Sequence, residues 1–202
     1  MHLHLMSRLF LCLVLPFFVA LPAHTAGLSR SYSYFSVGGS TIQEIYAQLV
    51  RRGPTVESTG QKHAGATRMD FKENVTFDRT RGKCRIAKAD ITLVAKIILP
   101  RWTARSSGSQ ETRVIWDALA ADIKRHEDDH VKIARRHAGE MESALRRLPA
   151  ARDCKALEKA KAQAIARQMT RHDAEQARFE RRETRGFEKR LERLVRQRMA
   201  GG

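Results

Sequence analysis

Alternating or β-branched apolar residues mark three segments in the first half of the chain, and each predicts a β-strand. The segments span residues 31–37, 67–78 and 91–99. Residues 79–82, Arg-Thr-Arg-Gly, predict a turn between the second and third segments, and Pro100 ends the third. These pieces indicate a small antiparallel sheet.

A short helix over residues 42–52 is predicted between the first two strands. Ser40 or Thr41 can cap its N-terminus, and Glu44 in the first turn complements the helix dipole. A Gly-Pro pair then ends the helix. The polar, glycine-containing residues 55–65 predict a loop.

The second half of the chain, from about residue 110, has a helical pattern. Apolar and histidine residues recur there at steps of three and four. They are Trp116, Leu119, Ile123, His126, His130, Ile133, His137, Met141, Leu145 and Leu148. Pro149 interrupts the pattern, and Asp153 can cap a returning helix over residues 154–168. A third stretch, residues 171–199, is rich in arginine and glutamate and has only a thin apolar stripe.

The expected fold class is therefore α+β. A small antiparallel sheet with one short helix comes first. A long helical hairpin and a basic C-terminal helix follow it.

The N-terminal residues predict export. A short polar and basic segment, residues 2–8, precedes the apolar run 9–21, which is shorter than the ~20 residues that a membrane-spanning helix needs. Small residues follow at 23–27, as they do before a signal-peptide cleavage site. We therefore expect a secreted or periplasmic protein, because no later stretch is apolar enough to anchor it.

Two cysteines remain once the signal is removed, Cys84 and Cys154. In an oxidising compartment two cysteines pair more often than not, so we expect a disulfide between them. The alternative role as zinc ligands is weaker, because neither cysteine lies in a Cys-x-x-Cys spacing.

The formal net charge of +16 is large for 202 residues. Such a surface attracts polyanions such as anionic lipid, acidic polymers or nucleic acid, although lysine and arginine also simply solvate exposed helices. Aromatic stacking residues are nearly absent from the arginine-rich tail, which argues against specific nucleic-acid binding. The charge does not indicate an oligomeric state.

The most informative motif is His-Glu-Asp-Asp-His at residues 126–130. On a helix, His126 and His130 lie one turn apart on the same face, so both imidazoles can reach one Zn2+ ion. Glu127 lies beside the ion instead of facing it, which suits a general base for a metal-activated water. The alternative is that the motif holds no metal and is a charged helix face with two solvated histidines.

A zinc site needs at least one further protein ligand. His137 lies ~10 Å along the helix from His130, which is too far for a shared ion. If the chain reverses near Ala151, residues equally distant from the turn face each other, and this places His172 or Asp173 opposite the histidine pair. We expect His172, with Asp173 as the alternative, to be the third ligand.

The chain resembles a bacterial family of unknown function described as predicted secreted zinc-dependent proteases. The resemblance covers most of the mature chain. It rests on residues 34–41, 53–54, 65–67, 84, 98–102 and 126–130. It implies a zinc-dependent protease fold with the zinc pair on a helix. A later family segment matches residues 172–179, but Arg178 stands where the family has a histidine, which puts the third ligand in question.

Two functions follow as expectations. The first is an exported zinc metallopeptidase that hydrolyses peptide or protein substrates, with Glu127 as the general base. A basic surface would draw acidic peptides or polymers towards it. The second is a non-catalytic envelope protein of the same fold that binds anionic polymers or lipid through its basic helices. We expect a signal peptide over residues 1–26, a protease-like domain over 27–177 and a basic helical extension over 178–202.

Overall fold

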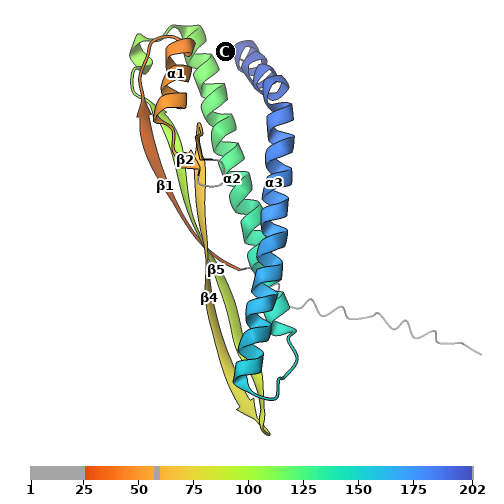
Figure 1. The fold of residues 1–202 in the computed structure, drawn as a ribbon. Helices are drawn as coiled ribbons and strands as arrows, with labels where there is room; N and C mark the ends of the chain where they lie inside the picture. The colour runs from red at the N-terminus through yellow and green to blue at the C-terminus, as the bar shows by residue number, and fades with distance from the viewer. Residues whose placement is uncertain (1–25, 57–59, 202) are drawn as a thin grey trace, which may run out of the picture.

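The computed structural model describes residues 26–56 and 60–201, and it confirms the α+β class (Figure 1). The strands are β1 (Gly27–Val37), β2 (Thr55–Val56), β3 (Gln61–Lys62), β4 (Ala66–Thr80) and β5 (Lys83–Trp102). The helices are α1 (Ile42–Arg52), the single 3-10 turn η1 (Arg105–Ser107), α2 (Gln110–Arg146) and α3 (Cys154–Ala200). The signal peptide expected at residues 1–26 falls almost wholly outside the described residues.

The main sheet has the strand order β1-β5-β4. β4 and β5 form a long antiparallel hairpin, and Arg81 and Gly82 at its turn have the positive φ angles 53° and 75°. β1 lies parallel to β5, from Gly27 opposite Thr92 to Val37 opposite Trp102. The sheet is therefore mixed, and the expectation of an antiparallel sheet was right for β4 and β5 only. Alternation of apolar residues predicts a strand but carries no information about its direction.

One face of the sheet packs against the helices. Alternate residues of β5 between Ala89 and Leu99 are buried, and α2 lies across them. Ile45 and Leu49 of α1 join the same core at one end of the sheet. On β4, alternate residues such as Arg68, Asp70 and Lys72 are exposed, so the face of the sheet opposite the helices meets solvent.

The predicted caps form as expected. Thr41 caps α1 by accepting a hydrogen bond from the backbone N–H of Glu44, whose side chain accepts one from the backbone of Thr41 in return. Asp153 caps α3 through the backbone N–H of Ala156. Two of the helix starts could therefore be predicted from capping residues alone.

α2 and α3 run side by side as a long hairpin over the sheet (Figure 1). Residues 154–168 and 171–199, which the sequence suggested as two stretches, form the single helix α3. The connection from α2 to α3 descends along the sheet, where Ala151 exchanges backbone hydrogen bonds with Cys84. The expected disulfide joins Cys84 to Cys154 at the start of α3. None of the helices in the described part of the chain is long and apolar enough to cross a membrane.

Candidate metal centre

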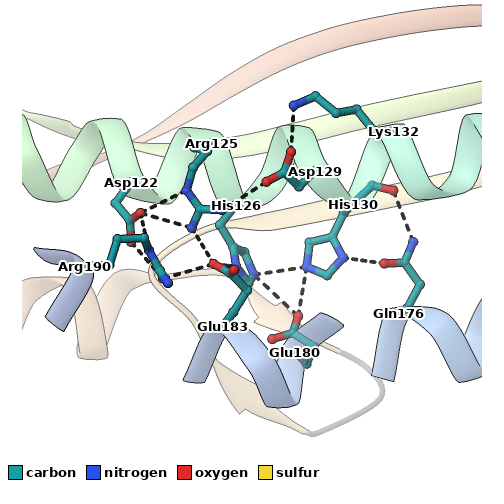
Figure 2. A network of polar contacts seen from close by, with 10 residues as sticks. All are labelled: Asp122, Arg125, His126, Asp129, His130, Lys132, Gln176, Glu180, Glu183 and Arg190. Carbon is teal, nitrogen blue, oxygen red and sulfur yellow. Dashed lines mark hydrogen bonds and ion pairs between the residues drawn. The ribbon is translucent and has the colours of Figure 1, made fainter. Parts of the chain in front are cut away.

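Three side chains from α2 and α3 converge on one point (Figure 2). Nε2 of His130 lies 3.0 Å from Nε2 of His126 and 2.8 Å from Oε1 of Glu180. The same Glu180 oxygen lies 3.5 Å from Nε2 of His126. The three potential ligand atoms all lie within 4.8 Å of one another. This is the spacing expected of three ligands around one ion.

The helices explain why these groups meet. His126 and His130 are four residues apart on α2, so their rings meet edge-to-face on one face of the helix, with centroids 4.7 Å apart. That face looks towards α3, which supplies Glu180. Phe179, buried on α3, packs against both rings with centroid distances of 5.0 and 4.8 Å. The rings are thus held between the helices and not splayed into solvent.

The outer nitrogens of both imidazoles face hydrogen-bond acceptors on α3. Nδ1 of His130 lies 2.6 Å from Oε1 of Gln176, and Nδ1 of His126 lies 3.5 Å from a carboxylate oxygen of Glu183. Each acceptor favours the tautomer that carries its proton on Nδ1 and leaves the Nε2 lone pair free. Both lone pairs then point at the Glu180 carboxylate, which is also an acceptor. In this neutral form three lone pairs meet at one point, which fits a metal ion, whereas without a metal a proton on Nε2 links each ring to Glu180.

The electrostatics of the site favour positive charge at the same point. Hydrogen bonds from His126 and His130 lower the pKa of Glu180 well below its ordinary value, which keeps it ionised. Burial lowers the pKa of His126, but Glu180 and Glu127 outweigh burial, and the pKa is raised. The ionised Glu180 and the raised pKa of His126 both indicate a local potential that also favours a bound divalent cation.

Glu127 lies on the same cleft and is only 4% exposed. Burial raises the pKa of Glu127, and the hydrogen bond that Thr67 donates to it over 2.8 Å acts in the opposite direction. Gly65, just before β4, packs closely on this carboxylate, since a Cβ atom there would lie 2.8 Å from Oε1 of Glu127. The start of β4 therefore fixes the position of Glu127.

A cleft of about 310 Å³ opens beside the three converging groups. The segment at residues 63–65 forms one wall, α2 forms the floor, and α3 forms the other wall. Ile123, Glu127, Glu180 and Phe187 are among the residues that line it. A molecule in this cleft would therefore lie against Glu127 and against His126 and Glu180, two of the three converging groups.

A network of ion pairs closes one end of the cleft. Asp122, 4% exposed, accepts hydrogen bonds from Arg190 at 2.7 and 3.2 Å and from Arg125 at 3.0 Å. Both arginines also bind Glu183. Burial raises the pKa of Asp122, but the bonds from Arg190 and Arg125 outweigh it, and the pKa is lowered. This network ties α3 to α2 just beyond the metal ligands (Figure 2).

The structure brings together the predicted residues His126, Glu127 and His130, but it does not bring His172 or Asp173 to them. His172 is buried against Phe71, its Nδ1 faces Asp173, and its Nε2 lies 3.0 Å from the Gln176 amide. It contacts His130 only through Gln176. Among the described residues the group that lies with the histidine pair is Glu180, eight positions later on α3, so Glu180 replaces His172 as the candidate third ligand.

The register of the hairpin explains this error. The expectation assumed a symmetrical turn near Ala151. Because Ala151 pairs with Cys84, the connection runs further down the sheet, and α3 begins beyond the end of α2 (Figure 1). Residues later on α3 therefore face His130. A signal for them existed in the sequence, since Gln176, Phe179, Glu180 and Glu183 stand at positions i, i+3, i+4 and i+7, which share one helix face.

Comparison with known proteins gives a family and no function. No curated protein and no solved structure matches the chain. The family model described as "Bacterial protein of unknown function (DUF922)" matches residues 32–186. The matched region includes the two histidines, Glu127 and Glu180. The chain therefore belongs to the bacterial family DUF922, whose function is unknown.

Proposed function

We propose that this protein is an exported zinc-dependent peptidase. The observation that carries the proposal is the convergence of His126, His130 and Glu180 on one point of a cleft that Glu127 also lines. The four groups come from two helices and are held in place by Thr67, Gln176 and Phe179. A charged helix face exposed to solvent would not need these contacts to the histidines and to Glu127.

Zinc is the ion that the ligand set fits best. Two histidines and one glutamate, with a further position left open, form one of the usual ligand sets of catalytic zinc. Zinc held in this way supplies Lewis-acid chemistry for the hydrolysis of a peptide carbonyl. The two imidazoles would bind through Nε2, because Gln176 and Glu183 engage the opposite nitrogens.

Glu127 would handle the proton in this reaction. As the oxygen of a water forms a bond to the peptide carbonyl carbon, the carboxylate accepts the proton that this water loses. When the C–N bond breaks, Glu127 delivers that proton to the leaving amine. Burial raises the pKa of Glu127 and so makes it a stronger base than an exposed glutamate.

Export is part of the proposal. The apolar segment at residues 9–21, with small residues after it, supports a signal peptide. The disulfide between Cys84 and Cys154 supports an oxidising compartment such as the periplasm.

Metal analysis and casein hydrolysis test the proposal together. Mature protein should contain close to one zinc per chain, and His126→Ala should remove it. Glu127→Gln should keep the metal and abolish hydrolysis, while the exposed Glu188→Gln on α3 should change neither. Protein without zinc, or hydrolysis that survives Glu127→Gln, would contradict the proposal.

The alternative is a non-catalytic envelope protein that binds anionic lipid or polymers. The observation in its favour is a row of exposed basic side chains on the last part of α3. They are Arg178, Arg181, Arg182, Arg185, Lys189, Arg193 and Arg196. Co-sedimentation with phosphatidylglycerol vesicles, lost when four of these are changed to glutamine, would favour this function if zinc is bound without Glu127-dependent hydrolysis.

A further inference from the structure

The cleft beside the candidate metal ligands is lined mainly by acidic charged groups, although the protein as a whole is strongly basic. The chain carries a formal charge of +16, yet four carboxylates line the cleft. They are Asp122, Glu127, Glu180 and Glu183. Arg190 is the only guanidinium among the described residues that line it. Among the described residues that line the cleft, the carboxylates thus outnumber the guanidinium groups.

The single guanidinium has no charge to spare for a substrate. Arg190 forms two hydrogen bonds to the buried Asp122 and a third contact, of 3.0 Å, to Glu183. Two carboxylates therefore neutralise it before any ligand arrives. A carboxylate on a substrate side chain would meet Glu180 and Glu183 without a free arginine or lysine among the described lining residues, and this would be unfavourable.

Apart from these charged groups, the cleft lining includes apolar side chains together with His63 and Thr184. Ile123 from α2 and Phe187 from α3 lie on it, opposite the Ala64-Gly65 backbone. Phe187 is 37% exposed, which is high for a phenylalanine. Covering this ring with an apolar side chain would remove hydrocarbon surface from water, at about 25 cal/mol per Å².

We propose that this cleft is a specificity pocket that accepts an apolar side chain next to the scissile bond and excludes an acidic one. The inference rests on the proposed peptidase function and names its substrate class. Phe187 and Ile123 select the side chain. The carboxylates around Arg190 reject aspartate and glutamate. The basic outer surface attracts acidic segments of a substrate only at positions remote from the bond that is cut.

Peptides of one sequence, with leucine, alanine or aspartate next to the cleaved bond, test the pocket on zinc-loaded mature protein. We expect kcat/KM for leucine to exceed that for alanine about 10-fold and that for aspartate about 100-fold. Phe187→Ala should reduce the leucine preference about 10-fold. Phe187→Arg should raise the relative rate on aspartate at least about 10-fold. Phe77→Ala, at the far end of β4, should leave the preference unchanged.

Two further measurements separate failure of the pocket from failure of the function. Hydrolysis of casein with equal rates on leucine and aspartate peptides would overturn the pocket and leave the peptidase intact. If no substrate is cut, binding of the leucine and aspartate peptides to the metal-free protein is compared by saturation-transfer NMR. Leucine contact that Phe187→Ala removes would support the pocket, and equal contact by both peptides would overturn it.

Discussion

The Nδ1 atom of His130 lies 2.6 Å from Oε1 of Gln176, and the same amide donates a hydrogen bond to the backbone carbonyl of His130 over 3.2 Å. One side chain on α3 thus fixes both the tautomer and the orientation of a ring on α2. Such partners commonly set metal affinity as strongly as some ligands do.

Gln176→Ala should therefore weaken zinc binding about 10- to 100-fold without unfolding the protein. Competition with a fluorescent chelator measures the affinity, and circular dichroism checks the fold. Gln163→Ala, at an exposed position of α3, is the matched control and should bind zinc like wild type. Wild-type affinity in Gln176→Ala would show that Gln176 does not orient His130.

The hydroxyl of Thr67 should be needed for catalytic turnover but not for zinc binding. It holds Glu127 through a hydrogen bond of 2.8 Å. Thr67→Val should lower kcat about 10-fold, since one hydrogen bond to a charged group contributes about 1.5 kcal/mol. Zinc content should stay the same, and Thr67→Ser should restore most of the rate. If Thr67→Ser is as slow as Thr67→Val, the hydroxyl is not the cause.

We expect the packing of α3 on α2 to weaken in acid, because Glu175 on α3 is ion-paired with α2. The Arg136 guanidinium and His137 lower the pKa of Glu175 from its ordinary value of 4.5 to about 2. Because this pKa is lower in the folded state, the ionised Glu175 stabilises the fold fully at pH values above about 4.5. This stabilisation is lost as the pH falls from about 4.5 towards 2. Urea titrations of wild type and Glu175→Gln, both in EDTA so that no metal is bound, measure the free energy of unfolding. The difference between the two proteins should be present at pH 6 and should shrink below pH 4.5. A difference that is constant with pH would contradict this account.

The disulfide should contribute strongly to stability, because it closes a long segment of chain. Cys84 and Cys154 are 70 residues apart, and loop-closure entropy for that length corresponds to about 4 kcal/mol. The double variant Cys84→Ser/Cys154→Ser should lose roughly this free energy of unfolding in urea titrations. Dithiothreitol should destabilise wild type equally and leave the double variant unaffected. An unchanged midpoint in reduced wild type would show that the bond does not stabilise the fold.

Much of the fold could be predicted because it depends on local patterns. The helix over residues 42–52 has its predicted bounds, since capping and a Gly-Pro pair act within a few residues. The strand direction of β1 could not be predicted, because it is set by pairing with β5, about 65 residues away in the sequence.

The candidate site divides in the same way. His126 and His130 follow from the helical period, which is local. Glu180 depends on the register between two long helices, and this register is set by the pairing of Ala151 with Cys84. A short shift at the turn is carried along both helices to the candidate metal site. An assumed symmetrical turn therefore pointed to His172, and the tertiary structure was needed to identify Glu180.

The proposed peptidase requires that His126, His130 and Glu180 hold one zinc ion. A crystal of the zinc-loaded mature protein, measured on both sides of the zinc absorption edge, locates the ion directly by its anomalous scattering. We expect a single strong peak about 2 Å from Nε2 of both histidines and from a carboxylate oxygen of Glu180. A peak at other residues, or no peak between these three side chains, would contradict it.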